Sequence, residues 1–406
     1  MKKFFERKNL FLRVFAGFVL GIILGLLAPG FSVDTKVVGD LYLNLIKLMV
    51  IPVVVCSVFC GITSIKDTSR LRQIGFKTVF LFVIMFVVSS FISLGVAFLI
   101  NPGKGLSHEG LAFTGELASL SLSSFLLQVV PTNIFSALSS GSTIGVILFT
   151  VLFAVSVVAI GEKGKVLVTF MQSLSSALFK MLSYIMELSP LGVMSLMAYS
   201  VARYGAGLFS SLAGYILCCY LSCILVFIFV MVIPVCLYTK VSPLRLLRAC
   251  GKIALVTMST TSSAATLPTT IRVSVEDLGA PKSISEFILP LGCTINMCGG
   301  ACSFCCLAVF TANVYSLDLS FTTILLMVGA ATLINMAAPG IPGGGIVLGA
   351  SFLSIFGLPF DIMGLISGFY RLLDMAFTTI NVEGDVAANL MISRNVGMYS
   401  GKEEGK

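Results

Sequence analysis

The chain has 406 residues, of which 57% are hydrophobic and 11% charged, with a formal net charge of +8 and a mean hydropathy of +1.05. A soluble domain of this composition would expose a largely apolar surface, so the composition excludes a soluble enzyme and predicts an all-α polytopic membrane protein. The excess of Lys and Arg is typical of the loops of membrane proteins and does not indicate a nucleic-acid partner.

Apolar segments long enough to cross a bilayer follow one another from the N-terminus. They lie near residues 10–29, 41–62, 77–100, 143–160, 166–188 and 209–238. The first has no cleavage site typical of a signal peptide, so we expect it to be the first span. Three further segments are interrupted by polar or Gly/Pro-rich runs, at 253–273, 284–312 and 322–355, and a last span covers about 359–393.

Lys and Arg gather in alternate connections, which predicts the topology. The basic regions are the N-terminus, the second, fourth and sixth connections and the C-terminus, whereas the other connections contain only Lys36, Lys104 and Arg203. We expect eight transmembrane helices with both termini cytoplasmic. Two re-entrant helical hairpins, at 253–273 and 322–355, would enter and leave the membrane on the same side, so both termini would stay cytoplasmic. Broken segments of this kind indicate a transporter binding site.

Four polar residues share one face of the last predicted span: Asp374, Thr378, Asn381 and Asp385. Their spacings of 4, 3 and 4 residues place them on a single helical stripe. A carboxylate at bilayer depth costs about 2.5–3.5 kcal/mol, so two of them require cations, hydrogen-bond donors or a wet cavity. The two aspartates are about 16 Å apart along an ideal helix. We interpret Asp374 as a partner for a ligand ammonium and Asp385, with Asn381, as part of a Na⁺ subsite.

Three interrupted runs supply the loosened backbone that such a site needs. The run at 260–268 is rich in small hydroxyl residues, the run at 296–300 places two glycines in an apolar helix, and the run at 339–345 is rich in Pro and Gly. Backbone freed at membrane depth must line a cavity or be packed in protein, and its carbonyls suit hard cations. The alternative interpretation of the first run is a packing surface of small residues, that of the second is a kink without ligand, and that of the third is an ordinary loop.

Other classes of protein remain open at this point. An intramembrane aspartyl protease would use Asp374 and Asp385, but its carboxylates must share one water, which about 16 Å of separation on one helix prevents. A channel is compatible with the broken segments, and saturable flux that needs a cation gradient would distinguish a carrier from it. The aspartates also have a structural interpretation, as buried carboxylates paired with Arg371 or Lys180.

Twelve cysteines lie mostly in apolar runs, where they act as small hydrophobic residues. The cluster from Cys293 to Cys306 contains a C-x-x-C pattern that would suit a soft metal. The one histidine, His108, is far away in sequence, so we favour the apolar interpretation and expect no organic cofactor.

Seven stretches match a family pattern in order, and on them the chain resembles the dicarboxylate/amino acid:cation symporter family, the glutamate transporter group. They lie at residues 45–53, 131–138, 189–193, 262–268, 291–297, 339–345 and 381–385. The match covers nearly the whole chain, and the combination of motifs is highly specific. The resemblance implies a secondary-active symporter rather than an enzyme.

The resemblance also implies an architecture, that of a homotrimer embedded in lipid in a bacterial inner membrane. Each protomer would have a fixed scaffold and a mobile transport part that moves by an elevator-like alternating access. Scaffold helices would occupy 1–76 and 102–208, and the transport part 77–101 and 209–406.

By position, the resemblance assigns roles to individual residues. Substrate would be held at the two hairpin tips and on the last helix by Ser262, Ser263, Ile341, Pro342, Gly343, Asp374, Phe377, Thr378 and Asn381. Within this set, Asp374 would bind the α-ammonium, Asn381 the α-carboxylate and Thr378 the polar end. The coupling cation would be bound by Asn296, Met297, Asn381 and Asp385.

Three departures from the family pattern concern substrate and cation. Phe377 stands where members with acidic substrates have an Arg, and a phenyl ring cannot pair with a carboxylate. We therefore predict a neutral amino acid, with a glutamate, aspartate or dicarboxylate substrate bound by a relocated Arg371 as the alternative. Cys298 and Tyr370 stand at positions that are usually acidic, so Na⁺ or H⁺ coupling and its stoichiometry stay open.

Overall fold

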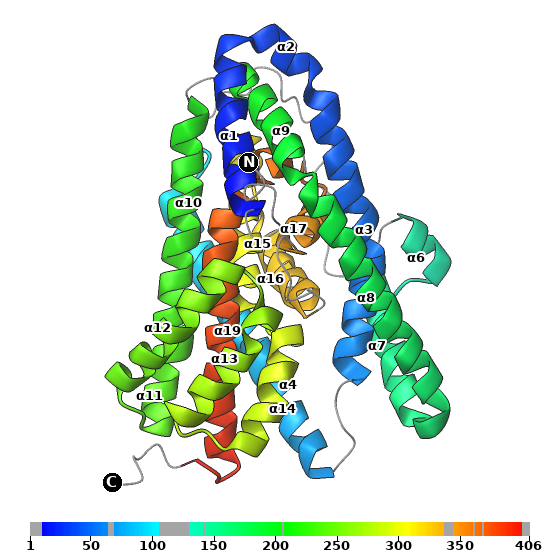
Figure 1. Cartoon of the computed structure of the whole chain (residues 1–406), viewed down its shortest axis with the longest axis vertical. Helices are drawn as coiled ribbons and strands as arrows, with labels where there is room; N and C mark the ends of the chain where they lie inside the picture. The colour runs from blue at the N-terminus through cyan, green and yellow to red at the C-terminus, as the bar shows by residue number, and fades with distance from the viewer. Residues whose placement is uncertain are drawn as a thin grey trace, which may run out of the picture.

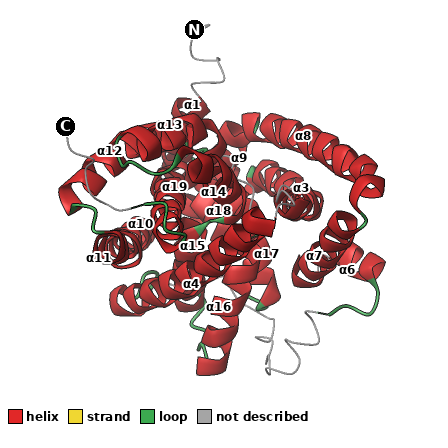
Figure 2. Cartoon of the chain, turned by 90° about the horizontal axis from the view of Figure 1, so that it is seen from below, coloured by secondary structure: helices red, strands yellow, loops and turns green. Residues whose placement is uncertain are grey.

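The fold is helical throughout the part of the chain that the computed structural model describes. Described are residues 10–63, 69–104, 130–140, 143–204, 207–336, 344–359, 362–367 and 369–399. Within these ranges there is no strand, as Figure 2 shows, which confirms the all-α prediction. By length and composition, four helices in these ranges are suited to crossing a membrane: Gln73–Ile100, Gly161–Ile185, Leu212–Thr239 and Lys282–Val314.

The described helices follow one another along the chain in two halves. The first half of the chain contains α1 (Leu10–Leu27), α2 (Pro29–Asp34), α3 (Lys36–Thr63), α4 (Ser69–Ile100), α6 (Ile134–Ser140), α7 (Thr143–Ala159), η3 (Gly161–Gly164), α8 (Lys165–Glu187) and α9 (Ser189–Tyr204). The second half contains α10 (Gly207–Val226), the π-helical η4 (Phe227–Val232), α11 (Ile233–Thr239), α12 (Pro243–Thr260), α13 (Ser263–Glu276), α14 (Lys282–Ile295), α15 (Cys298–Val314), α16 (Phe321–Asn335), α17 (Gly344–Ile355), α18 (Ile362–Ser367) and α19 (Tyr370–Asn395).

The helices pack in two groups that differ in their neighbours. In the first group α3 packs on α7, α8 and α9, and α1 packs on α9. In the second group α19 packs among α10 to α15, and α4 packs on α10 and α15. Figure 1 shows α19 running through the middle of the second group, with α7 and α8 standing to one side. Because α4 belongs to the second group, the chain contributes to this group twice. It does so first at α4 and, after returning to the first group, again from α10 onward.

Glycines allow α1 to lie directly against α9. Gly17, Gly21 and Gly25 recur every fourth residue on one face of α1, and each faces a backbone carbonyl of α9. A Cβ atom on Gly25 would lie 2.6 Å from the carbonyl oxygen of Ala198, which is closer than carbon and oxygen can approach. This small-residue spacing is a common way for membrane helices to associate, because dispersion contacts replace the missing hydrophobic effect.

Helix α9 corrects one sequence-based expectation. Arg203 was expected in a connection between two spans, but it lies in the last turn of α9. The helix begins at Ser189 with Pro190 in its first turn, where a missing N–H costs nothing. Its apolar face is buried through residues such as Met197 and Val201. Only 16 residues long, this segment is too short to be recognised as a separate span.

Two of the predicted breaks are confirmed, and the third lies outside the described residues. The first falls between α12 and α13, where Thr261 adopts a left-handed conformation with φ 47°. The second falls between α14 and α15, where Asn296 is extended. The third predicted break is flanked by α16 and α17, but residues 337–343 are not described. The last predicted span is two helices rather than one, because α18 ends at Ser367 before α19 begins.

We predict that Gly21→Leu destabilises the protein, because the new side chain would force α1 away from α9 and lose the packing between them. The matched control is Gly95→Leu on α4, where a Cβ meets nothing within 4 Å. Thermal unfolding in detergent can be followed with a thiol-reactive dye, which reports exposure of the buried cysteines. We expect a midpoint several degrees lower for the first variant only, and equal midpoints would contradict the packing described.

Candidate functional site

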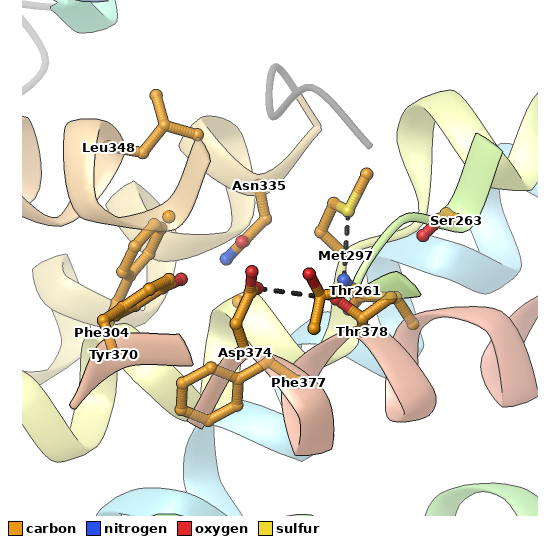
Figure 3. A pocket seen from close by; sticks show the side chains of 13 residues that line it. Thr261, Ser263, Met297, Phe304, Asn335, Leu348, Tyr370, Asp374, Phe377 and Thr378 are labelled. Atoms are coloured by element: carbon orange, nitrogen blue, oxygen red, sulfur yellow. Dashed lines mark hydrogen bonds between the residues drawn. The ribbon is translucent and has the colours of Figure 1, made fainter. Parts of the chain in front are cut away.

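A small cavity lies where the broken segments meet α19 (Figure 3). Its volume is about 40 Å³, and since one water needs roughly 10–15 Å³, it has room for only a few waters. A ligand of amino-acid size therefore requires a wall to move. The described residues that line it come from α12–α13, α14–α15, α16–α17 and α19: Thr261, Ser263, Met297, Gly300, Phe304, Asn335, Gly345, Leu348, Tyr370, Asp374, Phe377, Thr378 and Asn381.

Helix α19 presents four of the predicted residues to this cavity. Asp374, Phe377, Thr378 and Asn381 fall on one face because they occupy positions i, i+3, i+4 and i+7 of the helix, and all four are buried. The Thr378 hydroxyl donates a hydrogen bond to Asp374 at 3.4 Å. Asp374 is the one charged side chain among the described lining residues. The cavity thus offers one negative charge beside amide, hydroxyl and aromatic groups.

The backbone of α15 lies directly against α19 at Gly299. A Cβ atom here would overlap the backbone of Phe377, so only glycine permits this approach. Because the two helices are so close, the Gly299 N–H donates to Asn381 Oδ1 at 2.7 Å. This N–H belongs to the first turn of α15, where backbone donors have no partner within the helix. The contact fixes the Asn381 amide with its oxygen toward α15.

The extended residue Asn296 joins the break in α14–α15 to α19. Its Nδ2 donates to Asp385 Oδ1 at 2.8 Å and to the carbonyl oxygen of Asn381 at 3.2 Å. Its Oδ1 accepts from the Cys298 thiol at 3.1 Å. The amide of Asn381 donates to Met297 Sδ at 3.2 Å. All the residues predicted for the cation subsite are therefore in one network.

Asp385 belongs to this network and not to the lining of the cavity. It is 2% exposed, and Gly292 on α14 leaves room for it, since a Cβ there would overlap Asp385 Oδ1. The structure thus separates the two aspartates of the stripe, with Asp374 in the cavity and Asp385 behind it. This arrangement agrees with the interpretation as two subsites. It also rules out the shared water that an aspartyl protease requires.

The tip of α12–α13 places the two predicted serines differently. Ser263 lines the cavity and is 3% exposed. Ser262 caps α13 instead, accepting a hydrogen bond from the N–H of Ala265 at 3.2 Å. The preceding Thr261 lines the cavity with a positive φ, a strained conformation for a β-branched residue. Ile341, Pro342 and Gly343, the remaining predicted substrate residues, lie outside the described residues.

The basic residues considered as partners for the aspartates lie outside the described lining of the cavity. Arg371 Nη2 donates to the carbonyl oxygen of Thr260 at 3.4 Å and is not among the lining residues. Lys180 Nζ lies over the ring of Tyr184, 5.2 Å from its centroid. Arg371 also interacts electrostatically with Asp374, so the structural interpretation keeps support for this pair, whereas the contact of Lys180 with Tyr184 gives none for Lys180.

Several lining residues were missed by sequence reasoning. Asn335 ends the apolar helix α16, and a polar residue inside such a segment is itself a signal of a functional site. Tyr370 was noted only as a departure from the family, yet its ring lies 6.4 Å from that of Phe377. Phe304 and Leu348 carry no signal that distinguishes them from core residues.

The cysteines behave as small hydrophobic residues. All twelve are free, and Cys218 donates a weak hydrogen bond to Cys306 at 3.5 Å between α10 and α15. Among the described residues, no three His, Cys, Asp or Glu side chains are grouped so as to hold a metal ion.

Broken helices that turn backbone and polar side chains into a cavity within an apolar bundle are the construction of secondary transporters. Comparison with known proteins agrees. A model of the sodium:dicarboxylate symporter family matches residues 10–395, and the chain belongs to this family. It is therefore a multi-pass membrane protein that carries out cation-coupled symport, not an enzyme.

The relatives are similar over nearly their full length. The chain is 30% identical to the "proton/sodium-glutamate symport protein" of Bacillus caldotenax, covering 97% of this chain and 96% of the relative. It is 31% identical to the protein of the same description in Bacillus subtilis (strain 168), covering 96% and 93%. It is 28% identical to the "C4-dicarboxylate transport protein" of Laribacter hongkongensis (strain HLHK9), covering 95% and 89%.

Proposed function

We propose that this protein is a symporter of a neutral amino acid. The observation that carries the proposal is the wall of the cavity at Phe377. Its ring stands beside Asp374, and no Lys or Arg is among the described lining residues. A second substrate carboxylate would be buried there without a cationic partner, which is strongly unfavourable. A zwitterionic substrate with an uncharged side chain fits a cavity whose described lining has one carboxylate, that of Asp374, and otherwise neutral groups.

The groups around the cavity suit the two ends of such a substrate. Asp374 would accept the α-ammonium. The α-carboxylate would be bound by the amide of Asn381 and by the N-terminal N–H groups of α13 at Ser263, where the helix dipole favours an anion. Thr378 would contact the polar end of the substrate. By the family resemblance, backbone groups of Ile341–Gly343, which lie outside the described residues, would also hold the substrate.

The direct test is uptake into liposomes that contain the purified protein. The twenty amino acids, glutamate and aspartate among them, and C4-dicarboxylates would be compared under an imposed Na⁺ or H⁺ gradient. We expect saturable, gradient-dependent uptake of a neutral amino acid by the wild type and none by Asp374→Asn, which loses the charge that binds the ammonium. Uptake that is unsaturable would favour a channel, and normal uptake by the variant would remove the ammonium assignment.

We predict that Phe377→Arg shifts selectivity toward glutamate, aspartate or a dicarboxylate. The guanidinium would pair with the second carboxylate in the cavity, and charged hydrogen bonds of this kind are worth about 1.5–3 kcal/mol. Competition against neutral amino-acid uptake measures the shift, with Phe377→Leu as an uncharged control. Unchanged selectivity in the Arg variant would show that position 377 does not contact the substrate side chain.

We further propose that the coupling cation is Na⁺, bound by the Asp385 carboxylate, Asn381 and backbone carbonyls at Asn296 and Met297. Carboxylate and carbonyl oxygens are the ligands that hard cations prefer. The hydrogen bond from Asn296 holds Asp385 at the break between α14 and α15, where carbonyls lose their helical partners. H⁺ coupling is the alternative, since relatives are described as proton/sodium symport proteins.

We predict that Asp385→Asn weakens the cation dependence of substrate binding. The variant removes one negative charge while keeping the shape of the side chain, so a higher Na⁺ concentration is needed for half-maximal binding. Titration of substrate binding with Na⁺ measures the change, and a pH titration at fixed Na⁺ tests the H⁺ alternative. A Na⁺ titration that is unaltered in this variant would place the ion elsewhere.

A second candidate substrate is glutamate, aspartate or another dicarboxylate. Relatives described as glutamate and C4-dicarboxylate carriers favour it. Arg371 is the residue that would bind the second carboxylate, because its contact with Thr260 places it next to the cavity residue Thr261. Movement of the α12–α13 tip would be needed to bring its guanidinium into the cavity. The liposome assay distinguishes the two candidates directly.

We propose the family architecture for the whole protein. It comprises eight transmembrane helices with cytoplasmic termini and two re-entrant hairpins, α12–α13 and α16–α17, in a homotrimer of the bacterial inner membrane. The scaffold would consist of 1–76 and 102–208, and the transport part of 77–101 and 209–406. The packing of α4 with α10 and α15, rather than with its sequence neighbours, supports this division. An elevator-like movement of the transport part would carry the cavity across the membrane.

A further inference from the structure

The side-chain amide of Asn335 has one polar atom without a partner. Asn335 is the last residue of α16, lines the cavity and is 1% exposed. Its Nδ2 donates to the carbonyl oxygen of Ala331 at 2.6 Å, one turn earlier in the helix. Its Oδ1 is buried and accepts no hydrogen bond among the described residues. Buried amide oxygens are nearly always paired, so this one indicates a donor that arrives from elsewhere.

The position of this amide is fixed by its neighbours. A Cβ atom on Gly300 would overlap Asn335 Oδ1, so the amide occupies the space that a side chain at position 300 would fill. The bond from Nδ2 to α16 holds the other end of the amide. Figure 3 shows Asn335 and Asp374 directed into the same space from α16 and α19. The acceptor is therefore built into the cavity wall beside Gly300, and Asp374 lines the same cavity from α19.

The chemistry of the missing donor follows from the rest of the cavity. The α-ammonium is assigned to Asp374 on α19, and Asn335 lies on a different wall of the cavity, at the end of α16, so we assign the donor for Asn335 to the substrate side chain. Because the cavity of about 40 Å³ must widen even for the α-amino and α-carboxylate groups, a short side chain requires the smallest movement of its walls. An additional charged ammonium would find no second carboxylate among the described lining residues. A hydroxyl group on the β-carbon satisfies these conditions, because it is short, neutral and a donor.

We propose that Asn335 is a specificity-determining residue whose Oδ1 accepts a hydrogen bond from the side-chain hydroxyl of a small amino acid, of the serine or threonine kind. The inference rests on the proposed function, since it requires a neutral amino acid in this cavity. Asn335 selects the hydroxyl over a methyl group of the same size. A methyl group would leave the amide oxygen buried and unpaired, which is the basis of strong discrimination against isosteric analogues.

The test compares isosteric ligand pairs that differ only in this group. L-Serine is paired with L-2-aminobutyrate, and L-threonine with L-valine, and the affinity of each is measured by binding to the purified protein at saturating Na⁺. We expect the wild type to bind each hydroxyl ligand about tenfold more tightly than its methyl partner, the effect of one hydrogen bond. In Asn335→Leu, serine binding should weaken about tenfold while 2-aminobutyrate binding changes little, so that the preference disappears.

A matched control lies one turn earlier in the same helix. Thr332 is buried, and its hydroxyl bonds to the carbonyl oxygen of Val328 at 2.9 Å, but it does not line the cavity. Thr332→Val should therefore retain the preference for hydroxyl ligands. If Asn335→Leu does not fold, Asn335→Ala serves as a second variant. The ratio of the wild-type affinities for the hydroxyl and methyl ligands can be measured without any variant.

The outcomes separate this inference from the proposed function. Equal wild-type affinities for serine and 2-aminobutyrate would overturn the inference while neutral amino-acid binding stands. A preference that persists in both Asn335 variants would also overturn it, because another group would then select the hydroxyl. Binding of glutamate or a C4-dicarboxylate with no binding of any neutral ligand would overturn the proposed function and this inference together.

Discussion

The contact between the backbones of α15 and α19 at Gly299 determines the arrangement of the polar groups. Because Gly299 has no side chain, its N–H reaches Asn381, and the break that precedes it brings Asn296 against Asp385. A carboxylate in an apolar helix is tolerated only with such partners. The contact thus stabilises one aspartate of α19 within the protein and leaves the other, Asp374, facing the cavity.

The broken helices solve a related problem of unpaired backbone. Each break exposes N–H or C=O groups that water would otherwise satisfy, and within a membrane these groups must find partners in the protein or in a cavity. Ser262 satisfies one donor of α13 by capping, and Asn381 satisfies one of α15. These two capped helix ends, of α13 and α15, lie where the chain approaches the cavity. The same residues that permit the breaks therefore define the site.

The polar stripe and the breaks are predictable from sequence because they depend on local rules. Asp374, Thr378 and Asn381 follow the helical period, and hydroxyl-rich or Gly-rich runs interrupt helices wherever they occur. The close packing of α1 on α9 depends instead on two segments about 170 residues apart, so the regular spacing of Gly17, Gly21 and Gly25 has meaning only once α9 is placed. Asn335 carries a sequence signal, as a polar residue in an apolar helix, but its unpaired oxygen beside Gly300 is visible only in the structure. The separate helix α18 shows that hydropathy alone does not locate the start of α19.

Asp374 is the one charged side chain among the described lining residues, and the neutral substrate proposed for it has an electrical consequence for the transport cycle. A zwitterionic substrate adds no net charge. Each coupling cation that enters with it, and is not exchanged for another cation, therefore moves one positive charge through the membrane field. A potential of 100 mV is worth about 2.3 kcal/mol per elementary charge, which corresponds to almost fiftyfold in accumulation. A cell with a negative interior would thereby drive uptake with its membrane potential as well as with its ion gradient.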